Sequence, residues 1–137
     1  MAIWLLKTEP SDYSYEDLER DGTTMWDGVA NAMALQKLRL MREGDTALIY
    51  HTGDVKAWVG VADVVRGAYV NPGLDDPKMA VCDVRARRRV AHPVTLSAIK
   101  VRPELSEWEL VRIARLSVVP VSDAQWQTLQ EMAREEL

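Results

Sequence analysis

Residues 46–65 read TALIYHTGDVKAWVGVADVV and form two largely apolar runs on either side of a Gly-Asp turn at Gly53 and Asp54. β-Branched and aromatic residues are frequent in both runs, and they favour the pleated, half-buried surface of a sheet. A connection of four or five residues between such runs is typical of a β-hairpin. The segment therefore predicts two antiparallel strands, from which the rest of the chain can be read outward.

Three further stretches have the composition of strands. Residues 3–9 (IWLLKTE) form a short apolar run that stops at Pro10, and residues 79–91 (MAVCDVRARRRVA) form a long alternating one. Residues 116–121 (LSVVPV) form a brief run that we expect Pro120 to end. Most of the predicted strands are long, and they are not arranged as repeated strand-helix-strand units.

Five stretches predict helices from their capping residues. A Ser, Thr or Asn at the N-cap satisfies backbone N–H groups of the first turn, and an acid or amide three residues later completes a capping box. A glycine beyond the last turn is a common terminator, as at Gly22 and Gly44. The predicted N-caps are Ser14 with Asp17, Asn31, Thr95, Ser106 with Glu109, and Ser122 with Gln125.

This order of elements predicts the α+β class. Long antiparallel strands that close around helical insertions favour a small β-barrel or strongly curved sheet with helices packed outside, rather than a parallel sheet. The chain has 137 residues, no internal repeat and no linker rich in Gly, Ser or Pro. We therefore expect a single domain over residues 1–137.

The composition excludes several classes of protein. The net charge of −4 argues against a protein that holds nucleic acid by bulk charge, so any such binding must be local. One cysteine and two histidines leave no Cys/His cluster for zinc, and we expect neither a metal nor another cofactor. The apolar opening MAIWLL is too short to span a membrane. These features predict a cytoplasmic protein without a membrane partner.

Charge is unevenly distributed along the chain. Residues 85–102 contain six arginine and lysine side chains and no acid, whereas residues 9–21 contain six acids. In the strand predicted at 79–91, alternation places Arg85, Arg87 and Arg89 on one face. Such a face is most often only solvated, but beside an aromatic pocket these three arginines could contact phosphates.

Motifs of enzymes are scarce. The chain has no Gly-x-Ser-x-Gly elbow, phosphate-binding loop, dinucleotide fingerprint or His-Glu-x-x-His helix. His51 and Asp54 are close in sequence, but two polar residues without a motif are weak evidence for a catalytic triad. Cys82 alternates with valines and is expected to be a small buried residue rather than a reactive thiol.

Tryptophan is the unusual aromatic residue here, with five copies and no phenylalanine. The indole has a wide flat face that can stack on a heterocycle. Trp4, Trp58, Trp108 and Trp126 lie in apolar runs and are expected in the core. Trp26 differs, because it lies outside any periodic run, just before the turn at 27–28. It either packs onto the following helix or contacts a ligand.

Five segments together resemble the EVE domain, a family of the PUA-like superfamily related to the YTH readers. They are WLLKTEPSDYSYEDL, TTMWDGV followed by Asn31, LRLMREGDTALIYHTG, VGVADVV and WELVRIARLSVVPVS, in the order in which the family has them. The resemblance extends from about Trp4 to the last helix. It implies a PUA-like curved antiparallel β-barrel with surrounding helices, and it implies recognition of nucleic acid without catalysis by the domain.

The resemblance also implies a ligand pocket. This sequence departs from many relatives at Ala30 and Ala32, where they have bulkier or polar residues. We therefore expect its pocket to be wider or less basic than theirs. The positions that match the family's pocket are Lys7, Thr8, Trp26, Asn31, Tyr50, His51, Thr52, Leu116 and Ser117.

This pocket suggests how a base would be recognised. The expected partner is DNA or RNA whose modified base is turned out of its stack and placed on Trp26. The amide of Asn31 would read a base edge, Tyr50, His51 and Thr52 would form a wall, and Lys7 would meet a phosphate or a carbonyl. Two alternatives remain open: a nucleotide- or RNA-modifying enzyme that uses His51 and Asp54, and a module that binds a free nucleobase or another small molecule.

Overall fold

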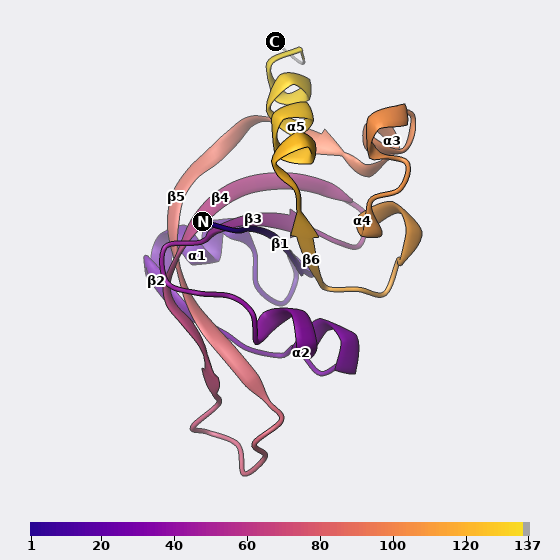
Figure 1. Cartoon of the computed structure of the whole chain (residues 1–137). Coiled ribbons are helices and arrows are strands. Elements are labelled where there is room, and N and C mark those ends of the chain that lie inside the picture. The colour runs from indigo at the N-terminus through magenta and orange to yellow at the C-terminus, as the bar shows by residue number, and fades with distance from the viewer. Residues whose placement is uncertain (136–137) are drawn as a thin grey trace.

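The computed structural model describes residues 1–135, in which strands form one strongly curved sheet with helices around it (Figure 1). The order of strands across the sheet is β2-β5-β4-β3-β1-β6. Their bounds are β1 (Ile3–Thr8), β2 (Thr23–Trp26), β3 (Thr46–His51), β4 (Ala57–Val70), β5 (Ala80–Thr95) and β6 (Val118–Val121).

The α+β class is confirmed, but the predicted antiparallel barrel needs correction. β1 and β3 pair in parallel, because the chain between them passes through two helices and β2, a connection long enough to bring β3 back in the same direction. Among residues 1–135 no ladder joins β2 to β6, so the sheet is open and these two strands are its edges.

The predicted hairpin at 46–65 is confirmed as β3 and β4, which pair antiparallel across a connection at residues 52–56. β4 continues as far as Val70 and pairs with β5 in a second, longer hairpin. Several register shifts interrupt these two ladders. Such bulges increase local twist and bend strands, which accounts for the curvature of the sheet.

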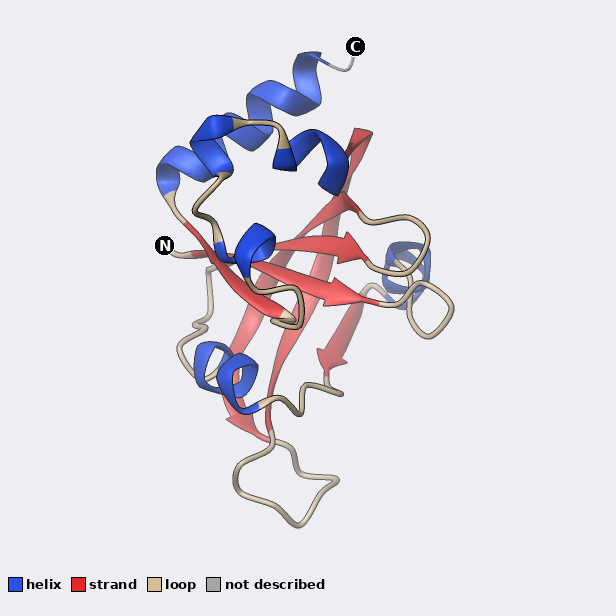
Figure 2. Cartoon of the chain, turned by 90° about the vertical axis from the view of Figure 1, so that its right-hand side faces the viewer, coloured by secondary structure: helices blue, strands red, loops and turns tan. Residues whose placement is uncertain are grey.

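Helices surround the rim of the sheet (Figure 2). In the view of Figure 1, α5 and α3 lie at the upper end and α2 at the lower end, where the β4–β5 hairpin extends beyond the body. Their bounds are α1 (Tyr15–Asp21), α2 (Ala32–Leu38), α3 (Leu96–Lys100), α4 (Glu109–Arg112) and α5 (Asp123–Glu135). No helix in residues 1–135 has the length and apolar content that a membrane span needs.

Four of the five predicted helix starts are confirmed. Ser14 and Asp17 form the capping box of α1, Asn31 accepts from two backbone N–H groups of α2, Thr95 caps α3, and Ser122 exchanges hydrogen bonds with Gln125 at the start of α5. The capping box at Ser106 is wrong. Pro103 begins a single 3₁₀ turn to Leu105, and the hydroxyl of Ser106 donates to the carbonyl of Pro103, so α4 begins later, after Trp108.

The two edge strands differ from the prediction. Residues 23–26, for which the sequence predicts no strand, form the edge strand β2 on β5. β6 continues through Pro120, which pairs with Trp4 of β1. β6 is an edge strand, where a missing backbone N–H is tolerated because one side of the strand has no partner.

The core is a cluster of buried side chains that come from the strands and from the helices. Trp58 and Trp108 are buried, and the indole N–H of Trp108 donates to the carbonyl of Pro120. The indole N–H of Trp4 donates to the buried carboxylate of Asp45, which also accepts from the backbone N–H of Arg42. Each buried polar atom in these contacts has a partner, as burial requires.

Candidate nucleic-acid interface

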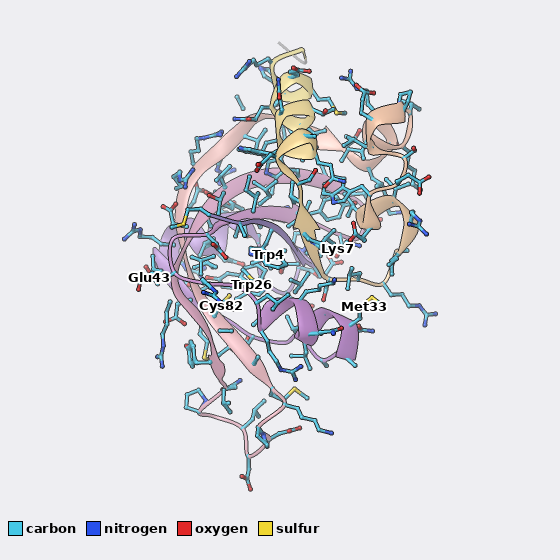
Figure 3. All side chains as sticks on the ribbon, in the orientation of Figure 1. Trp4, Lys7, Trp26, Met33, Glu43 and Cys82 are labelled. Atoms are coloured by element: carbon cyan, nitrogen blue, oxygen red, sulfur yellow. The ribbon has the colours of Figure 1, made fainter. Side chains whose placement is uncertain are left out.

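Two neighbouring cavities lie at the carboxyl ends of β1 and β3, and Lys7 borders both. The larger, here called the first cavity, has a volume of about 590 Å3. Trp26 and Lys7 both line this cavity, and in the view of Figure 3 both lie above α2. The first cavity is lined by Lys7, Thr8, Glu9, Asp12, Tyr13, Thr24, Met25, Trp26, Asp27, Gly28, Val29 and Ser117.

Trp26 is held firmly at the wall of the first cavity. It is the last residue of β2 and pairs with Cys82 of β5, and only 6% of its surface is exposed. The ring of Tyr13 meets the indole edge to face, with 6.2 Å between centroids and 85° between planes. The chain then turns at Gly28, whose φ of 81° is in the left-handed region that favours glycine. Strand pairing and the Tyr13 contact therefore fix the indole beside the cavity.

The polar groups of the first cavity are mainly hydrogen-bond acceptors. Three carboxylates line it, those of Glu9, Asp12 and Asp27, and Lys7 is its one cationic lining residue. The hydroxyl of Thr8 is already used, because it donates to the carbonyl of Tyr13 at 2.7 Å. This wall suits a ligand edge that carries N–H donors, and it opposes a phosphate.

Lys7 forms the partition between the two cavities. Its ammonium donates to the carbonyl of Ala114 at 2.9 Å and lies 5.9 Å from the ring centroid of Tyr50. Lys7 and Tyr50 are register partners in the parallel β1–β3 ladder, which is why their side chains meet on one face. Burial lowers the pKa of Lys7, because the charged form loses hydration there.

The second cavity, of about 270 Å3, lies on the other side of Lys7. It is formed by the end of β3, the connection at 52–56, α3, α4 and the residue Ala114 beyond α4. Tyr50 and Thr52, predicted as a wall of the base pocket, belong to this cavity and do not line the first. Its lining residues are Lys7, Tyr50, Thr52, Gly53, Lys56, Leu96, Lys100, Leu110, Val111 and Ala114.

His51 lines neither of these two cavities. Its Nε2 accepts a hydrogen bond of 3.0 Å from the backbone N–H of Tyr15, the first residue of α1. The pKa of His51 is lowered, mainly by burial and also by the charge of Arg89, although Glu9 acts in the opposite direction. The structure thus gives His51 a structural contact at the start of a helix.

Two further predicted residues have structural contacts. The side-chain oxygen of Asn31 accepts from the N–H groups of Met33 and Ala34 at 3.0 and 3.1 Å, and Asn31 does not line the first cavity. Leu116 is buried in the core, whereas Ser117 does line the first cavity, and its carbonyl accepts from the N–H of Lys7. Ala30 and Ala32 are exposed and absent from the lining of both cavities.

Arg85, Arg87 and Arg89 of β5 are exposed and face acidic neighbours. Arg87 forms an ion pair with Asp63, and Arg85 lies 3.8 Å from the same carboxylate. Arg89 pairs with Glu19 of α1. A phosphate at this face would compete with those carboxylates, so the prediction that the three arginines contact phosphates stays a prediction.

Sequence reasoning missed most of the polar wall of the first cavity. Asp12 and Tyr13 come from the turn before α1, and Thr24 comes from β2, which was not predicted as a strand. The available signal was the motif WLLKTEPSDYSYEDL, in which both Asp12 and Tyr13 stand. Spacing alone could not place that turn opposite Trp26.

Comparison with solved structures supports this architecture. Rpa0253 from Rhodopseudomonas palustris superposes with a TM-score of 0.92 at 36% identity, over 98% of this chain and 94% of that one. Human thymocyte nuclear protein 1, solved in complex with DNA that contains 5-methylcytosine, superposes with a TM-score of 0.87 at 26% identity, over 97% of this chain and 98% of that one.

Comparison with curated sequences leads to the same relatives. Chicken thymocyte nuclear protein 1 is 28% identical over 166 residues, an alignment that covers 96% of this chain and 69% of the chicken protein. The human protein is 31% identical over 123 residues, which cover 71% of this chain and 55% of the human one. The model of the EVE domain matches residues 2–132. The chain therefore belongs to the EVE domain family, as its sequence motifs predicted.

Proposed function

We propose that this protein is a non-catalytic nucleic-acid-binding module that holds a modified base, turned out of its strand, in the first cavity. The observation that carries the proposal is Trp26, an indole fixed at the wall of a cavity of about 590 Å3. Pockets of small-molecule ligands have volumes of about 300 to 1,000 Å3. The volume of the first cavity lies in this range, so the cavity can hold a nucleobase.

The human relative supports the class of ligand. Its structure was solved with DNA that contains 5-methylcytosine, and it has the same fold over nearly the whole of both chains. DNA is therefore the nucleic acid that we propose first, and RNA with a modified base is the second.

The polar wall of the first cavity supports a base with an amino group. Asp12 and Asp27 present carboxylate oxygens, which accept hydrogen bonds and do not donate them when ionised, whereas the carboxylate of Glu9 already accepts from Ser11 and Thr52. The exocyclic amino group of cytosine is a donor that Glu and Asp side chains recognise. The apolar side chains of Met25 and Val29 would favour a base that carries a methyl group, because binding removes the methyl group from contact with water.

Stacking supplies the energy that the extrusion of a base requires. Unstacking and unpairing cost a few kcal/mol, and an aromatic side chain returns about 1 to 3 kcal/mol per stacked base. Because strand pairing and Tyr13 already hold Trp26, little side-chain freedom is lost on binding. The buried indole, which borders the first cavity, thus acts as a preorganised platform.

The acidic wall also favours a second candidate, a module for a free nucleobase or nucleoside. The first cavity alone offers a phosphate one cation against three carboxylates. Salt dependence separates the two functions, because a strand releases counterions when its phosphates are contacted and a free base has none to release. The nucleotide-modifying enzyme has less support, since His51 is engaged by Tyr15 and borders neither cavity.

The test is the affinity of the wild type, Trp26→Ala and Trp26→Phe for matched strands with and without 5-methylcytosine, as DNA and as RNA. We expect Trp26→Ala to weaken binding of the modified strand by about 5- to 150-fold, which corresponds to the loss of one stacked base. Trp26→Phe should retain most of the affinity. An alanine variant that is folded and binds every strand as the wild type does would contradict the proposal.

A further inference from the structure

The second cavity differs from the first in the sign of its charge. Its lining contains three lysines, Lys7, Lys56 and Lys100, and the carboxylate of Glu9 lies at its edge, where it accepts from the hydroxyl of Thr52. The first cavity, across Lys7, contains three carboxylates and one lysine. The first cavity would therefore attract the neutral, donor-rich part of a ligand, and the second cavity would attract an anionic part.

The two outer lysines are available to a ligand. Both Lys56 and Lys100 are exposed, and neither ammonium has an ion pair or hydrogen bond to another residue in the described part of the chain. This distinguishes them from Arg85, Arg87 and Arg89 of β5, which face Asp63 and Glu19. They are the better candidates for contact with an anion.

The backbone fixes where Lys56 emerges. Its φ of 47° lies in the left-handed region, which is unfavourable for a residue with a side chain. The carbonyl of Lys56 accepts from the N–H of Leu96 at 2.8 Å, so the connection at 52–56 is tied to the start of α3, the helix that ends in Lys100. The two lysines thus belong to one connected rim of the cavity.

We propose that the second cavity is a subsite for the backbone phosphate next to the recognised nucleotide, with the sugar against the apolar wall of Leu96, Leu110 and Val111. This inference rests on the proposed function, because it assumes that the base occupies the first cavity. Lys7 lies between the base and the phosphate, since it lines both cavities. It follows that the strand passes over the ends of β1 and β3 rather than along the arginines of β5.

The first experiment compares two variants that each lose two positive charges. Lys56→Gln/Lys100→Gln removes the outer lysines of the subsite, and Lys37→Gln/Lys78→Gln removes two lysines that line neither cavity. Affinity for an oligodeoxynucleotide with one 5-methylcytosine is measured over a range of salt concentrations, and thermal melting confirms that each variant is folded.

The salt dependence gives the number of phosphates that the protein neutralises. The slope of log K against log salt concentration changes by about 0.7 to 0.9 for each phosphate. Both lysines border the subsite of one phosphate, so Lys56→Gln/Lys100→Gln should reduce the magnitude of the slope by about 0.7 to 0.9, and the control variant should not. A slope for Lys56→Gln/Lys100→Gln equal to that of the wild type overturns the subsite.

A neutral methylphosphonate locates the phosphate on the strand. Placed on the correct side of the 5-methylcytosine, it should weaken binding to the wild type and have no further effect on Lys56→Gln/Lys100→Gln, because the same contact is already lost. Equal losses in both proteins on either side of the base would show that the lysines contact another group, and would contradict the inference.

Free 5-methyldeoxycytidine distinguishes failure of this inference from failure of the proposed function. If the nucleoside binds in a way that depends on Trp26 but Lys56→Gln/Lys100→Gln leaves strand binding unchanged, the base site stands and the phosphate subsite is wrong. If neither the nucleoside nor the strand binds, both proposals are wrong.

Discussion

Trp26 illustrates how a single residue can serve both the core and a ligand site. With 6% of its surface exposed it is largely buried, yet it lines the first cavity. Its position at the end of an edge strand allows both, because the strand fixes the backbone and the next residues turn away. Replacement by alanine would remove a platform and also a packing contact, which is why Trp26→Phe is the necessary companion variant.

His51 gives the fold a dependence on pH. Its Nε2 accepts from the N–H of Tyr15 only while it is unprotonated, and burial lowers its pKa below the usual value of 6.5. The unfolded chain therefore binds the proton at a higher pH than the folded chain does. Hence we expect the free energy of unfolding to be highest above about pH 6.5 and to fall as the pH decreases from there toward the folded pKa.

Urea denaturation between pH 5 and pH 8 measures this effect. His51→Gln keeps an acceptor for Tyr15 but does not titrate, so its stability should vary less over this range than that of the wild type. His92→Gln serves as the control for the other histidine. Parallel pH curves for the wild type and His51→Gln would show that His51 is not the responsible group.

At the scale of elements, substitutions of Asn31 can distinguish its role as a helix cap from its predicted role in recognition of a base. Its side-chain oxygen caps α2, and loss of such a cap costs about 0.5 to 2 kcal/mol. We expect Asn31→Ala to lower the free energy of unfolding by that amount. Asn31→Asp keeps the capping oxygen and removes the amide donor, so it should preserve both stability and the affinity for the modified strand. A selective loss of affinity in Asn31→Asp would restore Asn31 as a reader of the base.

The junction between α1 and the sheet leaves no room beside Gly60. A Cβ there would collide with the ring of Tyr15, whose hydroxyl lies within hydrogen-bond distance of the carbonyls of Val61 and Arg88, at 2.7 and 2.8 Å. Gly60→Ala should therefore destabilise the protein by about 1 to 3 kcal/mol in urea denaturation. Gly73→Ala, at the tip of the β4–β5 hairpin, meets only an ordinary contact and is the matched control. Equal stability of the two variants would contradict this packing.

Elements with strong local signals were predictable from the sequence. The capping box at Ser14, the cap at Asn31 and the apolar runs of β3 and β4 each depend on neighbouring residues, and all are confirmed. β2 and the start of α4 were not, because they depend on distant contacts. Residues 23–26 become a strand only by pairing with β5, and Trp108 is positioned by the carbonyl of Pro120.

At the scale of the whole molecule, Cys82 reports on the integrity of the sheet. It lies in β5 opposite Trp26 of β2, has no exposed surface, and burial raises its pKa to about 12. We expect the folded protein to resist Ellman's reagent at pH 8 and the urea-unfolded protein to react at once. Labelling under native conditions that is faster than global unfolding would mean that β2 opens separately from the rest of the sheet.

The composition of the site also depends on the whole molecule. Four residues that the family motifs single out, Lys7, Thr8, Trp26 and Ser117, line the first cavity, and the parallel β1–β3 ladder explains why Lys7 meets Tyr50. The division into two cavities of opposite charge could not be predicted. It arises because Lys7 reaches across to Ala114, a contact between residues that are far apart in the sequence.

The central claim is that a modified base occupies the first cavity against Trp26. The most direct measurement is a titration of protein labelled with ¹⁵N-tryptophan, in which the five indole N–H signals are followed by NMR while 5-methyldeoxycytidine is added. Trp26→Phe assigns the Trp26 signal. The account predicts a saturable shift of the Trp26 signal, with those of the core residues Trp58 and Trp108 little changed. Saturable binding that leaves the Trp26 signal in place would contradict it.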